Sequence, residues 1–587
     1  MSMKSLLLRC LALAAIAPIC LSCMNTLKVS YIDNITEKID VKGAKYLLLP
    51  VQDKARETLV TPLSKDGTSM PFSVRLAEDS VDYYVPYRLP AEGASLRVDN
   101  CSFENLCWTA LKTSNQFKAA PNPFEPSIHF APSYGWNNDP NGLIWLDGNW
   151  HLFFQYNPYG SKWGNMTWGH AVSKDLVHWT QLDNAIFPDS LGTIFSGSCV
   201  IDKDNSAGFG KDAMVAVYTC AGKRQVQCLA YSADEGKTFA KYVGNPVLTS
   251  EKPDFRDPKV FWHKETGKWI MSLAAGNVIE FYSSSDLKHW KYESCFGEGY
   301  GYHNGVWECP DLFELPVDGN PGDKRWVLLT SSNIGGSQGP AVQYFTGKFD
   351  GHSFVCENKP ESSRLVDYGR DFYAAVTWDG VPDGRRIMIG WMSNFFYADR
   401  VPDIIQRGGM TVPRELRLKN VGGEIALCSI PVSELGEVAR PVSQTSSFDV
   451  DGEHHCESYR GGCAIDVKFE ISDLKCDIAG IKLFDTKGDY ADILIDVSDS
   501  TLKVEREHCQ DVGFSGNFAF VNKAKLSGAN PISVEIVIDR ASIECFANGG
   551  EVAVTEAMFP AERLDRMSFY AVGGRYSVSN LVVREIK

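Results

Sequence analysis

Short stretches in which apolar and polar residues alternate recur along most of the chain, and turn-forming residues separate them. This pattern is typical of β-strands that bury one face. The clearest stretches cover residues 151–156, 213–218, 269–273, 326–330 and 386–391. The pattern predicts an all-β protein.

A degenerate repeat accompanies these strands. The segment Ser173-Lys-Asp-Leu-Val-His-Trp179 recurs at 284–290, and weaker copies lie at 232–239 and 349–354. The aspartates within the copies, at positions 175, 234, 286 and 350, lie 52 to 64 residues apart. Spacing of this size, with short strands between, indicates propeller blades of four strands each. With five strand stretches, the sequence predicts a five-bladed β-propeller over residues 128–435.

The tryptophans mark the limits of this region, because thirteen of the fourteen lie between Trp136 and Trp391. Most of them are expected to fill the propeller core, although flat aromatic faces also suit sugar rings. The strand pattern continues without tryptophan over 440–587, which predicts a C-terminal antiparallel β-sandwich. Residues 23–120 contain further short strand-like runs and predict a small N-terminal accessory β-rich domain. A proline-rich linker at 121–127 follows it.

The N-terminus has the features of a targeting segment. Basic residues precede an apolar stretch at 10–21 that is too short to span a bilayer, so residues 1–22 are predicted to be a signal peptide. The stretch ends in Leu-Ser-Cys and resembles the cleavage box of bacterial lipoproteins, in which Cys23 would be lipidated. An ordinary signal peptide is the alternative. The sequence thus predicts an exported lipoprotein, periplasmic or on the cell surface, that contacts the membrane only through its lipid.

Charge and cysteine content exclude several classes of function. The chain carries 73 acidic and 58 basic residues, a net charge of −15, which would repel a nucleic-acid backbone. The fourteen cysteines beyond Cys23 are scattered and form no CxxC pair, so neither a zinc site nor a dense disulfide scaffold is expected. Most are expected to be buried thiols, and Cys101 with Cys107 is one disulfide candidate. No metal or other cofactor is predicted.

Three acidic residues are candidates for catalysis. Asp139, Asp257 and Glu308 each precede the repeat aspartate of their blade by 29 to 42 residues, which is the place of the innermost strand. Asp139 and Asp257 directly precede proline, which favours an extended backbone. Three carboxylates that face one channel would repel each other and make a poor inert core. For Asp139 alone, within Asn-Asp-Pro-Asn-Gly, a turn residue is the alternative.

The sequences around these acids resemble the three signature blocks of glycoside hydrolase family 32, which contains invertases, inulinases and levanases. The blocks are Trp136–Gly142, Phe255–Pro258 and Trp307–Asp311. Further matches cover residues 154–158, 163–164, 168–170, 195–198, 371–374 and 390–391. The resemblance extends from about residue 128 to the C-terminus, so residues 24–120 are an addition to the common family pattern.

The resemblance implies a retaining mechanism with a covalent fructosyl-enzyme. Asp139 would be the nucleophile, Glu308 the acid and then the base, and Asp257 would stabilise the transition state. The side chains that resemble the family's pocket wall are Asn138, Gln155, Trp163, Phe195, Ser196, Arg256, Tyr373 and Trp391. For Arg256, a purely structural ion pair is the alternative.

The predicted function is release of fructose from the ends of fructans (levan or inulin) or from sucrose. Three alternatives are a fructosyltransferase, a non-catalytic fructan-binding propeller lipoprotein, and the related five-bladed arabinofuranosidase and xylosidase group. The Asn-Asp-Pro-Asn-Gly and Glu-Cys-Pro blocks favour a fructose enzyme over the last group. The linkage preference stays open.

Overall fold

The computed structural model describes residues 25–63, 70–336, 339–459, 463–509 and 512–586. It consists almost entirely of strands, and the described ranges contain two short helices, α1 (Cys107–Ala110) and α2 (Ser433–Val438). The all-β prediction is therefore confirmed. The predicted signal peptide and Cys23 lie outside the described residues. Within the described ranges, no helix combines the length and apolar character needed to cross a bilayer.

The chain divides into two compact units, the first ending at Lys118 and the second starting at Ala119. The first unit is a small sandwich of two antiparallel sheets. One sheet has the order β1-β2-β7-β4-β5 and the other β6-β3-β8. Apolar side chains such as Ile39, Leu49 and Leu96 are fully buried and form its core. The strands are β1 (Thr26–Tyr31), β2 (Thr36–Lys42), β3 (Tyr46–Val51), β4 (Thr58–Pro62), β5 (Phe72–Val74), β6 (Tyr83–Arg88), β7 (Ala94–Asp99) and β8 (Lys112–Ser114).

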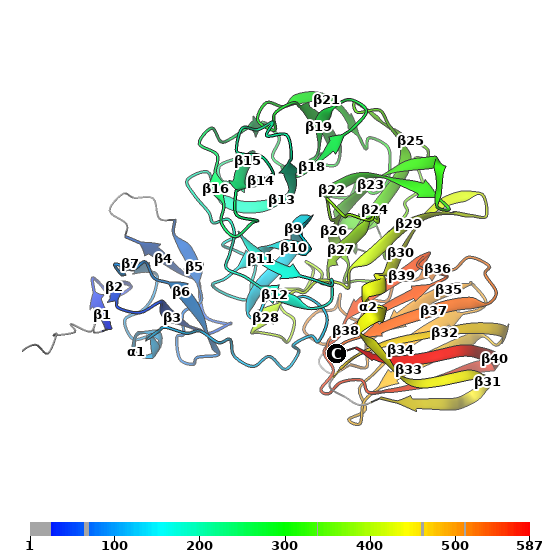
Figure 1. The fold of residues 1–587 in the computed structure, drawn as a ribbon. Helices are drawn as coiled ribbons and strands as arrows, with labels where there is room; N and C mark the ends of the chain where they lie inside the picture. Colours follow the sequence, from blue (N-terminus) through cyan, green and yellow to red (C-terminus); the bar gives the residue numbers. More distant parts are fainter. Residues whose placement is uncertain (1–24, 64–69, 337–338, 460–462, 510–511, 587) are drawn as a thin grey trace, which may run out of the picture. The chain divides into compact units, whose positions relative to one another are not determined.

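The second unit begins with a propeller of five blades (Figure 1). Blades 1 and 2 contain β9 (Gly135–Leu146), β10 (Asn149–Asn157), β11 (Thr167–Ser173), β12 (Trp179–Gln181), β13 (Thr193–Asp202), β14 (Ala213–Ala221), β15 (Gln225–Ser232), β16 (Ala240–Lys241) and β17 (Leu248–Thr249). Blades 3 and 4 contain β18 (Phe255–His263), β19 (Lys268–Ala275), β20 (Ile279–Ser284), β21 (Lys291–Phe296), β22 (Trp307–Val317), β23 (Asn320–Gly336), β24 (Gly339–Phe349) and β25 (Phe354–Cys356). Blade 5 contains β26 (Tyr373–Thr377), β27 (Ile387–Trp391), β29 (Arg414–Val421) and β30 (Glu424–Pro431).

The innermost strands close the ring. They are β9, β13, β18, β22 and β26; each contacts the innermost strand of the next blade, and β26 contacts β9. A two-residue strand, β28 (Gln406–Arg407), leaves blade 5 and pairs in parallel with β9, with Gln406 opposite Gly135. The last blade is thereby hydrogen-bonded to the first.

The sequence repeat corresponds to one turn in each of blades 1 to 4, between the third and fourth strands. In blade 1 a carboxylate oxygen of Asp175 accepts the backbone N–H of Val177 at 3.0 Å and of His178 at 2.8 Å. Asp286 accepts the corresponding two N–H groups in blade 3. A short acidic side chain that satisfies backbone donors two and three residues ahead is a common way to close such a turn.

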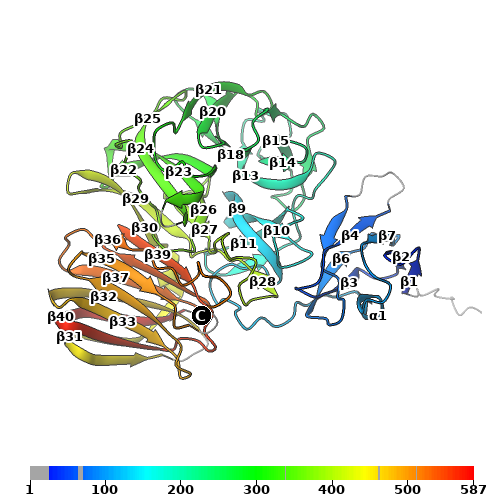
Figure 2. The ribbon, with the colours of Figure 1, turned by 180° about the vertical axis from the view of Figure 1, so that it is seen from behind.

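A β-sandwich follows the propeller (Figure 2). Its strands are β31 (Ala439–Ser458), β32 (Ala464–Lys475), β33 (Ile478–Phe484), β34 (Tyr490–Asp496), β35 (Thr501–Glu505), β36 (Ala524–Lys525), β37 (Ile532–Ile538), β38 (Ser542–Ala547), β39 (Val552–Ala557) and β40 (Arg566–Ile586). Alternate residues of these strands, such as Ile465, Val467 and Phe469, form one large buried core. The predicted order of propeller and C-terminal sandwich is confirmed.

Candidate active site

The five innermost strands share one irregularity. In each blade, two residues of the innermost strand stand opposite a single residue of the second strand, which is a β-bulge. The bulged pairs are Asn138–Asp139, Phe195–Ser196, Asp257–Pro258, Cys309–Pro310 and Ala374–Ala375. A bulge bends a strand and changes the direction of its side chains, so it is suited to building a site.

The three acids occupy this bulge at successive positions rather than at equivalent ones. Asp139 is the second bulged residue of its strand, Asp257 is the first, and Glu308 directly precedes the bulge. The expectation of an extended backbone is wrong for Asp257, whose φ is 65°. The first bulged residue is left-handed in blades 3, 4 and 5, and this conformation costs a residue other than glycine on the order of 1 kcal/mol.

Asp139 is surrounded by hydrogen-bond donors from its own blade and the next. Its Oδ2 atom accepts the Ser196 hydroxyl at 2.6 Å, and its Oδ1 atom accepts the Asn138 amide at 3.0 Å. Burial, and next the charge of Glu308, raise the pKa of the Asp139 carboxyl, while the two donors act in the opposite direction. The hydrogen bonds therefore favour a carboxylate in a place where burial disfavours one.

Asp257 lies deeper, with 5% of its surface exposed. Its Oδ2 atom accepts the backbone N–H of Cys309 at 3.1 Å. The Cys309 thiol lies 3.7 Å from the same oxygen and 3.5 Å from Oδ2 of Asp139. The pKa of Asp257 is raised to about 7: burial raises it most, the neighbouring Arg256 lowers it, and Glu308 and Asp139 raise it. Cys309, the residue that follows Glu308 in the chain, thus contacts both aspartates through its sulfur.

Glu308 has a different set of partners. The guanidinium of Arg256 donates to its Oε1 atom from Nη2 at 2.9 Å and from Nε at 3.2 Å. The Tyr373 hydroxyl donates to its Oε2 atom at 2.6 Å. Arg256 is itself oriented by Asp254, whose Oδ1 accepts Nη1 at 2.6 Å. Glu308 is the one member of the three that is paired closely with a cation.

The structure brings most of the predicted pocket residues to these acids. Ser196 and Asn138 contact Asp139, while Arg256 and Tyr373 contact Glu308. Gln155 is buried on β10, at the position opposite the bulge that carries Asp139.

Three predicted pocket residues are aromatic and do not contact the carboxylates directly. Trp163 is 52% exposed and meets Phe195 edge to face at 6.1 Å between ring centroids. Trp391 is fully buried against Trp136. We infer that Trp391 forms a rear wall, whereas Trp163 is open to solvent.

Sequence reasoning missed two features of the site. The first is the Cys309 sulfur between the two aspartates, although the Glu-Cys-Pro block contained it. The second is Phe395, which is 39% exposed and packs on Trp391 and Tyr373 with centroid distances of 4.6 and 5.8 Å. The sequence could have indicated Phe395, because it is an aromatic residue only four positions after Trp391. Tyr373, predicted to contact the substrate, donates its hydroxyl hydrogen bond to Glu308.

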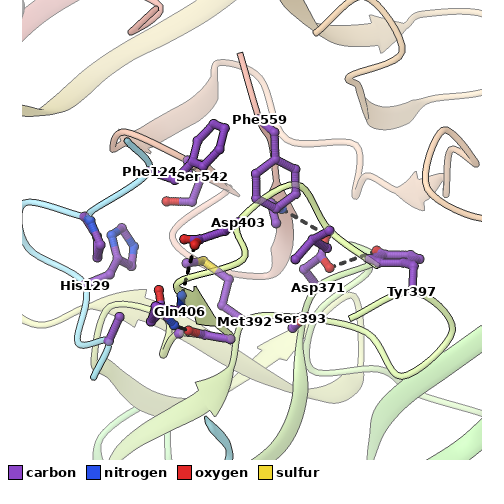
Figure 3. A pocket seen from close by; sticks show the side chains of 17 residues that line it. Phe124, His129, Asp371, Met392, Ser393, Tyr397, Asp403, Gln406, Ser542 and Phe559 are labelled. Atoms are coloured by element: carbon purple, nitrogen blue, oxygen red, sulfur yellow. Dashed lines mark hydrogen bonds between the residues drawn. The ribbon is translucent and has the colours of Figure 1, made fainter. Parts of the chain in front are cut away.

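A separate cavity of about 60 Å³ lies between the propeller and the sandwich (Figure 3). Its lining includes Phe124, Tyr397, Asp403, Gln406 and Phe559, and none of the three acids. The carboxylate of Asp403 has hydrogen-bond partners in the lining of the cavity, because it accepts the backbone N–H of Ile405 and of Gln406 at 3.0 Å each. This cavity is therefore distinct from the catalytic candidates.

Three family models match the sequence. The Glycosyl hydrolases family 32 N-terminal domain covers residues 129–429, and the family 32 C-terminal model covers residues 434–585. A domain of unknown function, DUF4980, covers residues 34–128.

Curated relatives and solved structures agree with these matches. The chain is 42% identical to a levanase of Bacillus subtilis over 79% of this chain and 70% of the relative. It is 34% identical to an extracellular exo-inulinase of Aspergillus awamori over 77% of this chain and 92% of the relative. The crystal structure of an exo-inulinase from the same fungus matches with a TM-score of 0.75 at 32% identity, over 80% and 99% of the two chains. A fructofuranosidase from Schwanniomyces occidentalis complexed with fructose matches with a TM-score of 0.71 at 31% identity, over 78% and 97%.

Proposed function

The chain belongs to glycosyl hydrolase family 32, and we propose that it is a retaining fructan hydrolase in which Asp139 is the nucleophile and Glu308 the acid and base. The substrate would be a β-fructofuranoside, since the relatives with which it shares most of its length are a levanase and exo-inulinases. The observation that carries the proposal is the convergence of three carboxylates from three blades around Cys309 and Arg256.

Asp139 and Glu308 have different surroundings, and each set of contacts bears on the proposed role. Asp139 receives hydrogen bonds from neutral donors only, so its charge is stabilised but remains available to attack the anomeric carbon of a fructosyl unit. Glu308 would protonate the leaving oxygen and then accept a proton from water. Tyr373 and Arg256 would fix the carboxyl of Glu308 in one orientation during both steps.

Asp257 would act without forming a bond to the sugar. One of its oxygens is held by Cys309 N–H, so the other oxygen can accept hydroxyl groups of the fructosyl unit. A carboxylate beside the ring would also stabilise the positive charge of an oxocarbenium-like transition state. This assigns Asp257 a binding and electrostatic role.

Trapping of the covalent intermediate tests these roles. An activated fructoside that reacts slowly should label the wild-type enzyme, and peptide mapping after a denaturing quench should find the fructosyl group on Asp139. Asp257→Asn should still become labelled, but more slowly, because its nucleophile is intact. A label on Asp257, or on the Asp139→Asn variant, would contradict the assignment.

Product analysis tests the substrate and the direction of attack. With levan, inulin and sucrose in parallel, an enzyme that acts from chain ends releases fructose from the first minutes and no intermediate oligosaccharides. Growth of longer oligomers from sucrose would instead identify a fructosyltransferase, which requires the same three acids. Absence of turnover on all three, together with tight binding, would favour a fructan-binding protein.

We also propose that the protein is exported and carries a lipid on Cys23, within the lipoprotein-like cleavage box. The extracellular exo-inulinase among its relatives supports export. Intact mass of the protein purified from membranes should show a processed N-terminus with acyl chains. Cys23→Ala should release the enzyme from the membrane fraction without changing its kinetics.

A further inference from the structure

Two buried thiols face each other in the N-terminal unit. Cys101 and Cys107 are both fully buried, and their sulfur atoms are 3.6 Å apart. A disulfide needs a sulfur separation of about 2.05 Å, which a small rotation of the two side chains can supply from this starting distance. The pair is therefore close enough to be joined without rearrangement of the strands.

Backbone hydrogen bonds fix both ends of the loop that carries these thiols. The N–H of Cys101 donates to the carbonyl of Ile35 at 3.2 Å, and the N–H of Cys107 donates to the carbonyl of Ala77 at 2.9 Å. The indole N–H of Trp108 donates to the carbonyl of Ser102 at 2.7 Å and closes the loop on itself. The approach of the two sulfurs is thus a consequence of the fold.

The two cysteines lie next to elements of different sheets. Cys101 comes two residues after β7, the central strand of the five-stranded sheet. Cys107 begins α1, which leads into β8 of the three-stranded sheet. A bond between them would tie the segment that follows β7 to the helix that precedes β8, and small domains with limited cores benefit from such a link although the loop it closes is short.

We propose that Cys101 and Cys107 form a disulfide in the exported protein and that this bond fastens the two sheets of the N-terminal unit together. The inference rests on the proposed export, because disulfides persist in oxidising compartments. Two S–H bonds break and one S–S bond forms. The two protons and two electrons pass to an exchanging oxidant, such as a periplasmic or extracellular dithiol oxidase, whose disulfide is reduced to two thiols. Because both sulfurs are buried in the folded unit, the exchange takes place while the chain folds.

A second pair of thiols provides an internal control. Cys220 on β14 and Cys228 on β15 are also buried, and their side chains are hydrogen-bonded. However, Cys220 stands opposite Val226 and Cys228 stands opposite Tyr218, so the two cysteines are diagonal neighbours. Diagonal positions on paired strands have Cα atoms about 7–8 Å apart, beyond the usual span of a disulfide. This pair should remain reduced.

Thiol mapping of the full chain tests the proposal. The protein is purified after export, unfolded in the presence of an alkylating reagent and digested without reductant. We expect a linked peptide that contains Cys101 and Cys107, and alkylated Cys220 and Cys228. Alkylation of both Cys101 and Cys107 in a protein with a processed N-terminus would overturn the proposal.

Two further arms separate this inference from the proposal of export. If the N-terminus is unprocessed, the leaderless chain is refolded in a glutathione redox buffer. A missing linked peptide in that refolded protein overturns the disulfide independently of export.

Thermal stability provides the second test. Reductant should lower the thermal proteolysis midpoint of the N-terminal unit by on the order of 10 °C in the wild type and in Cys220→Ser/Cys228→Ser. It should leave Cys101→Ser/Cys107→Ser unchanged, and an equal response of all three proteins would contradict the role of the bond.

Discussion

Buried charges occur in two regions of the second unit, and the two regions treat them in opposite ways. At the candidate active site, three carboxylates share essentially one cation, Arg256, and this cation bonds to Glu308 and lies 3.9 Å from Asp257. The pKa values of Asp139 and Asp257 are both raised, first of all by burial. Like charges are gathered there and left largely uncompensated.

Around Arg414 and His129, between the propeller and the sandwich, the buried acids are paired with cations. Arg414, fully buried, bonds to Asp367 at 2.8 Å and to Glu544. His129 lies between Asp539 at 2.9 Å and Glu544 at 2.8 Å. Although burial opposes it, hydrogen bonds and the positive charges of these partners lower the pKa of Asp539 and Glu544. These carboxylates stay ionised and join the two domains.

The difference teaches how burial alone misleads. Both regions contain deeply buried acids, but only one combines them with an incomplete set of counter-charges. An enzyme that must stabilise a cationic transition state gains from uncompensated negative charge, whereas an interface gains from neutrality. The uncompensated cluster is therefore the one that we propose as the functional site.

The largest expected effect follows from replacing the nucleophile. Asp139→Asn should lower kcat by on the order of 10⁴-fold or more, because no covalent intermediate can form. The free energy of unfolding should stay unchanged or increase, because a like charge beside Glu308 is removed. Initial rates on sucrose and chemical denaturation on the same preparation measure both quantities. A variant that loses activity and stability together would remove the distinction between the two regions.

The interface should show the converse result. Arg414→Met leaves Asp367 and Glu544 buried without their cation and should cost roughly 3–5 kcal/mol of unfolding free energy. The kcat per folded molecule should stay within a few-fold of wild type, because Arg414 contacts none of the three acids. Arg417→Met is the matched control, since Arg417 pairs with Glu415 at 2.8 Å on an exposed strand position and should cost below about 1 kcal/mol. Equal costs for the two variants would contradict this view of the interface.

These two regions also differed in how far the sequence could predict them. The catalytic acids lie in three distinctive local blocks, so Asp139, Asp257 and Glu308 could be singled out from residue order alone. The blade pattern could likewise be predicted from the repeated turns that contain Asp175 and its equivalents, because a hydrogen bond between residues close in the chain requires a recognisable local motif. The ion pairs of Glu544 with Arg414 and with His129 connect residues more than 100 positions apart and leave no local sequence motif.

The bulges were the main feature of the site that the sequence did not reveal. A proline after Asp257 favours an extended backbone locally, but the pairing of β18 with β19 inserts an extra residue and selects φ of 65°. That choice depends on the partner strand and on the N–H of Cys309, which approaches from another blade. Local propensity therefore predicted the wrong conformation for Asp257.

The free energy of unfolding should depend on pH over different ranges for the candidate active site and for the interface between propeller and sandwich. The folded pKa of Asp257 is raised to about 7 from 3.8, so its protonated form contributes stability below pH 4 that is lost as pH rises towards 7. The folded pKa of His129 is raised to about 9 from 6.5, despite burial, by its two carboxylates. Its contribution is present below pH 6.5 and is lost as pH rises through 9.

The window of Asp257 should contain roughly 4 kcal/mol and that of His129 roughly 3 kcal/mol, and one substitution should remove each. Asp257→Asn should flatten the fall in unfolding free energy between pH 4 and 7, and His129→Gln should flatten the fall between pH 6.5 and 9. The measurement is the difference between variant and wild type in denaturant titrations at closely spaced pH values, which cancels the other titrating groups. If either variant flattens the window assigned to the other, the assignments of pKa are wrong.

The smallest expected effect concerns the aromatic border of the active site. Phe395 packs on Tyr373, whose hydroxyl contacts Glu308, and the acid must stand beside the leaving oxygen. The sugar beyond that oxygen should therefore rest near the exposed face of Phe395. Phe395→Ala should raise KM for sucrose and short fructans by roughly five-fold, about 1 kcal/mol, with little change in kcat, because the contact is made equally in the ground and transition states. Trp262→Ala is the control variant. Trp262 is 43% exposed and lies five residues beyond Asp257 along β18, roughly 16 Å away. Initial-rate kinetics on both variants measure the difference. A fall in kcat without a rise in KM for Phe395→Ala would show that the ring orients Tyr373 and Glu308 rather than the leaving sugar.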